Sequence, residues 1–374
     1  MNAEMALWLQ MTKFSSFLII ISVGLFLWLG LVGMSGHPCH LDDVVDESQR
    51  VYQWQLLGSC GEEDRAKFPV QAADIVKALK EGYGVELRGV ALNGDLDFDQ
   101  LSPESLDVDK IPALFVREIF HREGITEARI IKGPVIMEDV QVLGSMATNL
   151  TVNGYMLITG PVSMKGTTFE KSVDFSRTVF YGPVDFSNAI IRSEGFFIKA
   201  LFVKEALFEK TAFGTHSRFH KAVFGDRVTF TRAGFNGLAE FLEVGFHKET
   251  GFSRTRFVMG TGFSGSHFHN ILDFSEATFD KGVYFRFVEF DGDAYFRRST
   301  FKQEADFTQA TFGGISDFTK VRFEVSPQFT GTVIPKVQPP MSGLQNPQFQ
   351  AAIFFLLVGF LLIFLVFWKK GKIG

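Results

Sequence analysis

Residues 173–191 read VDFSRTVFYGPVDFSNAII, and the spacing of their phenylalanines predicts the fold of the chain. The same register continues from Phe169 to Phe329, with alternating steps of six and five residues and no slip. It has 30 positions, and all of them are phenylalanine except Ile191. A fixed period sustained over this length indicates a solenoid built of stacked coils.

A second regularity accompanies the first. The residue two positions before each phenylalanine is nearly always small or β-branched, as in Val173, Thr178 and Val184. Side chains at i and i−2 lie on the same face of an extended chain, so each short strand directs one small and one large side chain inward. An eleven-residue apolar period also suits a right-handed helical coiled coil. Steps of five and six, however, would scatter the rings around a helix of 3.6 residues per turn.

Together with AVFGDRVTFTRAGF (222–235) and ADFTQATFGGISDF (305–318), this stretch resembles the pentapeptide-repeat proteins, in the Phe-rich variant whose every second unit gains a residue. The resemblance implies an all-β solenoid, a right-handed quadrilateral β-helix with four units per coil. Two eleven-residue pairs then make a coil of 22 residues. Thirty sides make about seven and a half coils, a rod of about 35 Å. The predicted core ladder contains Phe175, Phe186, Phe197, Phe208, Phe219, Phe230, Phe241, Phe252, Phe263, Phe274, Phe285, Phe296, Phe307 and Phe318.

The repeat is predicted to begin before this regular register. Three segments share one sequence pattern that begins with GPV: GPVIMEDVQV (133–142), GPVSMKGTTF (160–169) and GPVDFSNAII (182–191). The last two lie one coil apart, and the larger gap between the first two indicates an insertion around residues 145–153. LRGVALNGDLDF (87–98) is interpreted as an earlier partial coil.

The segment before the repeat is predicted to close its N-terminal end. VQAADIVKALKEGY (70–83) has helical spacing of apolar residues. A solenoid end exposes apolar rings and unpaired strand edges, so a small helical cap is expected there. Within the less regular residues 99–130, Ser102, Pro103 and Glu104 indicate a second helix start through N-cap and first-turn signals.

Two apolar runs without charged residues, 14–35 and 351–368, are each long enough for a transmembrane α-helix. A cleaved signal peptide is the alternative for the first run, but its apolar stretch exceeds a typical signal-peptide core. Lys13 precedes the first run, and three lysines follow the second. By the excess of positive charge on cytoplasmic flanks, both ends of the chain are predicted to be cytoplasmic.

These features predict an inner-membrane protein with two spans, whose residues 36–350 are periplasmic or otherwise extracytoplasmic. Cys39 and Cys60 are the chain's two cysteines, and an oxidising compartment predicts that they pair, with two free thiols as the alternative. The predicted order is a cytoplasmic N-terminus (1–13), the first span (14–35), a neck with the cap (36–84), the β-helix (85–330, regular from 160), a Pro-rich tether (331–350), the second span (351–368) and a cytoplasmic C-terminus (369–374).

The charge balance bears on nucleic-acid partners. Between Gly166 and Thr330, 20 Lys and Arg balance 20 Asp and Glu. Some pentapeptide-repeat proteins mimic DNA, which requires a strongly acidic surface that this segment lacks. A neutral rod also gives little attraction to phosphates, so we expect no nucleic-acid partner.

One set of polar side chains is a candidate metal site. His247, His269 and Asp291 each follow a ladder phenylalanine at intervals of 22 residues, so a 22-residue coil stacks them in a column. Imidazole and carboxylate groups suit zinc and similar metals, and the alternative is surface residues without function. His267, two residues before His269, is assigned to a small-residue position that points inward, outside the column.

No phosphate-binding glycine loop, nucleophile elbow or HExxH pattern occurs, and no cofactor is expected. We therefore expect a non-catalytic, membrane-anchored scaffold or protein-interaction module, in its most concrete form an accessory subunit of a larger membrane complex. Its partners would be the bilayer and a membrane protein or a second copy of the chain. The alternative is a ligand- or metal-binding protein or an enzyme, with a site on the solenoid wall or in the neck (37–130). The repeat itself does not decide between these functions.

Overall fold

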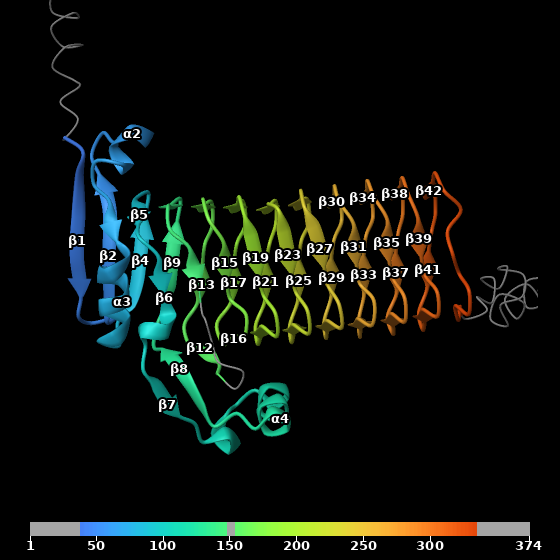
Figure 1. Ribbon diagram of the computed structural model, residues 1–374, viewed down its shortest axis with the longest axis horizontal. Helices are drawn as coiled ribbons and strands as arrows, with labels where there is room; N and C mark the ends of the chain where they lie inside the picture. The colour runs from blue at the N-terminus through green and yellow to red at the C-terminus, as the bar shows by residue number, and fades with distance from the viewer. Residues whose placement is uncertain (1–37, 148–153, 335–374) are drawn as a thin grey trace, which may run out of the picture.

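The computed structural model describes residues 38–147 and 154–334. They form a β-solenoid of about 11 turns with four faces, each a sheet in which every strand lies beside the strand of the preceding coil (Figure 1). Partners in the regular part are 22 residues apart, as in the pairing of Phe246 with Phe268. The predicted four-sided solenoid and its 22-residue coil are therefore confirmed.

We call the faces walls A to D, in the order in which the chain visits them. Wall A has 12 strands: β1 (His40–Asp46), β2 (Val51–Leu57), β4 (Gly84–Arg88), β9 (Val135–Glu138), β13 (Val162–Ser163), β17 (Val184–Asp185), β21 (Ala206–Leu207), β25 (Val228–Thr229), β29 (Thr250–Gly251), β33 (Leu272–Asp273), β37 (Ala294–Tyr295) and β41 (Ser316–Asp317). Wall B has 11 strands: β3 (Val70–Gln71), β5 (Ala91–Asn93), β10 (Gln141–Val142), β14 (Thr168–Phe169), β18 (Ile190–Ile191), β22 (Ala212–Phe213), β26 (Gly234–Phe235), β30 (Arg256–Phe257), β34 (Thr278–Phe279), β38 (Thr300–Phe301) and β42 (Arg322–Phe323).

The other two walls are slightly shorter. Wall C has 9 strands: β6 (Leu96–Asp97), β11 (Met146–Ala147), β15 (Val173–Asp174), β19 (Glu194–Phe196), β23 (His216–Arg218), β27 (Leu238–Glu240), β31 (Thr261–Gly262), β35 (Val283–Tyr284) and β39 (Ala305–Asp306). Wall D has 10 strands: β7 (Pro103–Ser105), β8 (Glu127–Ile131), β12 (Met156–Ile158), β16 (Thr178–Phe180), β20 (Leu201–Phe202), β24 (Val223–Phe224), β28 (Gly245–Phe246), β32 (His267–Phe268), β36 (Glu289–Phe290) and β40 (Thr311–Phe312). The pairs β1–β2 and β7–β8 are antiparallel, whereas the stacked coils pair in parallel.

Aromatic columns fill the core. The Phe230 ring stacks on Phe208 at 4.8 Å and on Phe252 at 4.7 Å, each one coil away. It meets Phe219, from the opposite wall C, edge-on at 5.6 Å and 87°. Offset stacking and edge-to-face contact are the two favourable arrangements of aromatic pairs. The predicted ladder is fully buried from Phe175 to Phe307, and only its last member, Phe318, near the C-terminal end of the described solenoid, is partly exposed.

The five-residue steps contain a turn that the spacing of the phenylalanines does not reveal. The second residue after the phenylalanine that begins the step has a positive φ, as at Asn188 (59°), two residues after Phe186. A hydrogen bond of 2.9 Å from the Ala189 N–H to the Phe186 carbonyl closes the turn. A type II turn requires a positive φ at this position. The positive φ recurs every 11 residues from Gly166 to Gly331, at Arg177, Asn188, Lys199, Lys210, Lys221, Arg232, Glu243, Arg254, Gly265, Glu276, Phe287, Arg298, Gln309 and Lys320.

Replacing Phe287 with Gly should stabilise the solenoid by about 0.5–1 kcal/mol. Phe287 has a φ of 56°, and its side chain is 59% exposed, so the substitution relieves left-handed strain without emptying the core. The greater freedom of glycine in the unfolded chain offsets part of this gain. Urea denaturation measures the change. Gly265→Ala, at the same turn one coil earlier (φ 71°), is the matched reverse control and should destabilise. A loss of stability in Phe287→Gly would contradict the prediction.

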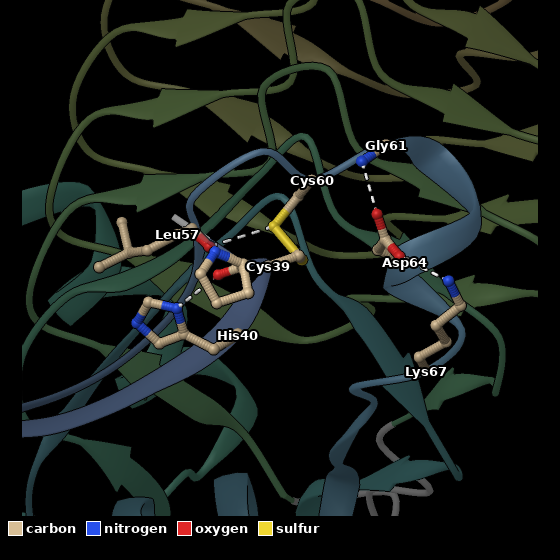
Figure 2. The surroundings of a disulfide bond; sticks show 8 residues. Cys39, His40, Leu57, Cys60, Gly61, Asp64 and Lys67 are labelled. Atoms are coloured by element: carbon tan, nitrogen blue, oxygen red, sulfur yellow. Dashed lines mark hydrogen bonds and ion pairs between the residues drawn. A yellow bond between two sulfur atoms is a disulfide. The ribbon is translucent and has the colours of Figure 1, made fainter. Parts of the chain in front are cut away.

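The helix α3 (Ala72–Lys80) lies at the N-terminal end of the solenoid, where the sequence predicts a cap. Its buried residues Ile75, Val76 and Leu79 belong to the same apolar cluster as the aromatic ladder. Beyond it, β1 and β2 extend wall A. A disulfide joins Cys39 to Cys60 with the Cα atoms 4.9 Å apart, close to the short helix α2 (Glu62–Arg65) (Figure 2). The hairpin of β1 and β2 is therefore tied covalently near its open end.

Between walls C and D, the chain leaves the first coil and builds a side module. The module contains η1 (Phe98–Gln100), β7, η2 (Val108–Lys110), α4 (Leu114–Glu123) and β8. The predicted helix start at Ser102, Pro103 and Glu104 is wrong, because Pro103 opens the edge strand β7. At the edge of a sheet, the missing N–H of proline need not cost a ladder hydrogen bond. The helix begins instead at Leu114.

The predicted spans, 14–35 and 351–368, lie outside the described residues, as do both predicted cytoplasmic ends and most of the tether. In residues 38–147 and 154–334, no helix combines the length and the apolar character needed to cross a membrane.

Candidate functional site on wall D

The outward face of wall D is apolar in its early coils. Val179, Leu201 and Val223 lie on β16, β20 and β24, one residue before the inward phenylalanine of each strand. The helix α4 packs over them, and Val179 and Leu201 are buried as a result. Figure 1 shows the module that carries α4 standing off the solenoid beside β12 and β16. The module thus covers the apolar part of this wall.

A cleft of about 420 Å³ lies between α4 and wall D. Glu123 of α4 and Lys199 of the solenoid form an ion pair across it at 2.9 Å. Tyr155 lines the cleft, and burial raises the pKa of its hydroxyl, so the phenol stays neutral. The remaining lining residues are Ile119, Arg122, Leu201, Lys221, Val223 and Glu243. Lys221 also pairs with Glu243 of the next coil at 3.4 Å, so opposite charges neutralise one another here, and the pair of Glu123 with Lys199 is the one that links the module to the wall.

Beyond α4, the outward side chains of wall D become polar. His267 precedes and His269 follows the inward Phe268, and Asp291 follows Phe290 on the next coil. His267 Nε2 lies 2.7 Å from Asp291 Oδ2, and His269 Nδ1 lies 3.2 Å from the same oxygen. The two imidazole centroids are 3.6 Å apart. One ligand atom from each of the three residues lies within 4.8 Å of the others, so they could share a metal ion.

The inward assignment of His267 is wrong by one residue. The small inward position before Phe268 is Ser266, which is buried and donates its hydroxyl hydrogen bond to the Phe241 carbonyl. His267 is the next residue and therefore points outward. His247 lies one coil earlier, with its ring 4.8 Å from that of His269. The residues whose ligand atoms converge are His267, His269 and Asp291, so His267 takes the place that the sequence assigns to His247.

The cluster perturbs the protonation of its members and neighbours. Burial lowers the pKa of His247, and the nearby His269, His267 and Lys248 lower it further. Burial alone would raise the pKa of Asp291, but the hydrogen bonds and electrostatic attraction of His267 and His269 outweigh it, and the pKa lies below its ordinary value. Asp291 is therefore a carboxylate at neutral pH.

A second pair of histidines, on wall C, also contacts a carboxylate, but there an arginine binds the same carboxylate. His216 Nε2 lies 2.7 Å from Glu240 Oε2, and His220 Nε2 lies 3.4 Å from the same oxygen. The Arg218 guanidinium also binds this oxygen, at 3.0 Å. Arginine is a permanent cation that neutralises the carboxylate, so this group is complete as a surface ion-pair network.

With the geometry described, the class of the protein is a four-sided β-solenoid with one repeat unit on each wall. Residues 164–212 and 288–333 match the family model of pentapeptide repeats (9 copies), so the solenoid contains pentapeptide repeats. Solenoids of this kind are generally structural or interaction modules. Comparison with curated proteins and with solved structures gave no match.

Proposed function

We propose that this protein is a non-catalytic interaction scaffold anchored in the cytoplasmic membrane, an accessory subunit of a larger membrane complex. The observation that carries the proposal is the way the walls use their charges. Arg254 Nε contacts Glu276 Oε2 at 2.9 Å and Lys302 Nζ contacts Asp280 Oδ1 at 2.7 Å, in both cases across neighbouring coils. Charges that pair along the rod are not gathered around a reacting group, and such a surface suits contact with a partner better than catalysis.

The shallow hollows on the outer surfaces of the walls also support a role as an interaction scaffold. A hollow of about 360 Å³ on wall A includes Leu207 and Gly251, and one of about 320 Å³ on wall C includes Leu242 and Gly262. Small-molecule sites enclose most of their ligand. These hollows instead lie open on a wall, where glycines leave room between the side chains of adjacent coils. They suit the side chains of a partner protein.

The sequence supplies the membrane part of the proposal. The apolar runs 14–35 and 351–368 would anchor the chain at both ends and place a right-handed β-helix on the extracytoplasmic side. The disulfide between Cys39 and Cys60 fits that compartment, because disulfides persist in oxidising environments. A rod tied at both ends would present its walls along the membrane surface.

The test is gentle detergent extraction of the native full-length protein, followed by native electrophoresis and mass spectrometry. We expect one or more companions at fixed stoichiometry. Lysine is then placed at one outward position on each wall, at Leu207 (A), Ile190 (B), Leu242 (C) and Thr311 (D). Loss of the companion from the variant of one wall, with retention in the other three, supports a docking wall. Migration as a lone monomer, or recovery of the chain in the soluble fraction, overturns the proposal.

A further inference from the structure

We propose that His267, His269 and Asp291 bind one divalent transition-metal ion, with Zn²⁺ as the reference ion, on wall D. The proposal is independent of the scaffold role and of the membrane. Two imidazole nitrogens converge on the same Asp291 oxygen, at 2.7 and 3.2 Å. All three ligand atoms lie within 4.8 Å of one another. Zn²⁺ binds nitrogen and carboxylate oxygen at about 2.0–2.2 Å, so small rotations of partly exposed side chains would admit the ion.

A fourth residue orients one of the ligands. Glu289 Oε2 lies 3.4 Å from Nδ1 of His267, on the other side of the ring from Asp291. A carboxylate beside Nδ1 would stabilise a proton there, in the tautomer whose Nε2 can bind a metal ion. Metal-binding histidines almost always have such a partner on their second nitrogen. Binding of the ion would then replace the proton through which Nε2 of His267 donates to Asp291.

The ligand types select the class of metal. Imidazole favours Zn²⁺, Ni²⁺, Co²⁺ and Cu²⁺, whereas Mg²⁺ and Ca²⁺ require sets of oxygen ligands. Three protein ligands on an open wall leave at least one coordination position for water or for a group from a partner. The histidines belong to one coil and Asp291 to the next, so a bound ion would also link two coils.

The contrast with wall C argues that the cluster is more than an ion-pair network. There, the Arg218 guanidinium occupies the carboxylate of Glu240. On wall D, the described residues give Asp291 ion pairs only with His267 and His269, and with no Lys or Arg. A carboxylate held against two histidines without a permanent cation leaves an electrostatic site that a divalent ion can fill.

The test uses the purified full-length protein without a histidine tag. Calorimetric titration with ZnCl₂ should give one ion per chain, and Co²⁺ should give the visible absorption of a coordinated site. His267→Gln and His269→Gln should each weaken Zn²⁺ binding more than Glu289→Gln, for which a loss of roughly 10-fold is expected. The matched control is His216→Gln on wall C, which should bind as the unaltered protein does.

Zn²⁺ should also raise the melting temperature of the unaltered protein, increasingly as the free Zn²⁺ concentration exceeds the dissociation constant, and should not do so in His267→Gln. Circular dichroism establishes that each variant is folded. Absence of Zn²⁺ binding to the unaltered protein overturns the proposal. So does binding that survives both His267→Gln and His269→Gln, or that falls equally in His216→Gln.

Discussion

Replacing Phe197 with Ala should destabilise the solenoid by about 3–5 kcal/mol, whereas the same change at the adjacent Phe196 should cost less than about 1 kcal/mol. The Phe197 ring is fully buried and stacks on Phe219 at 4.8 Å and 4°. It also meets Phe186 and Phe208 edge-on, at 5.8 and 5.7 Å. Removing it leaves a cavity in the core, and a closely packed solenoid can collapse only partly around such a cavity. The Phe196 ring instead faces outward.

Phe196 is a stringent control because it differs from Phe197 by one position and by nothing in chemistry. Its ring lies 5.6 Å from the Arg218 guanidinium on the surface of wall C, a contact of modest energy. Each coil contacts only its neighbours, so the lost stability should be concentrated in the coils around residue 197. Urea denaturation and native-state hydrogen exchange measure both the size and the location of the change. Equal effects of the two substitutions would contradict the inward and outward assignment.

The same pair of residues explains why the fold can be predicted from sequence. In Gly195-Phe196-Phe197, composition does not distinguish the two rings, but the step of six from Ile191 selects Phe197 as the inward one. A one-residue slip would reverse the two faces of a strand, so a register kept through 30 positions leaves little freedom in the core. Walls, coil length and aromatic columns follow from that register.

The outward features are less predictable, because no comparable periodicity constrains them. The positive φ of Arg177 or Lys199 has no composition signal, since most of these turns lack the glycine or asparagine that would reveal a type II turn. The candidate site illustrates a second limit. The 22-residue coil is enough to predict that His269 and Asp291 lie side by side. To predict that His267 joins them, the inward and outward faces of a strand only two residues long must be assigned correctly. The structure of the side module depends on the packing of α4 against wall D. The helix-start signals at Pro103 are local and do not predict this long-range contact.

Replacing Phe120 with Ala should release the module that carries α4 from wall D while the solenoid remains folded. The Phe120 ring is fully buried and lies 4.8 Å from the ring of Tyr155. It belongs to an apolar cluster with Leu157, Val179 and Leu201 that is separate from the aromatic ladder. The truncation should cost about 3–5 kcal/mol. A helix of 10 residues has little stability of its own, so a loss of this size should exceed what holds α4 in place.

Hydrogen exchange distinguishes this outcome from global unfolding. Amides of α4 should lose their protection in Phe120→Ala, whereas those of the distant coils around Phe252 and Phe274 should exchange as in the unaltered protein. Release of α4 exposes the apolar strip of Val179 and Leu201, so the variant should also bind a hydrophobic dye and self-associate. The control is Leu114→Ala on the same helix, whose side chain is 62% exposed and whose loss should leave protection unchanged. Retained protection of α4 in Phe120→Ala would show that the ion pair of Glu123 with Lys199 and the strand pairing of β7 with β8 suffice to hold the module. Loss of protection throughout the solenoid would show instead that module and rod fold as one cooperative unit.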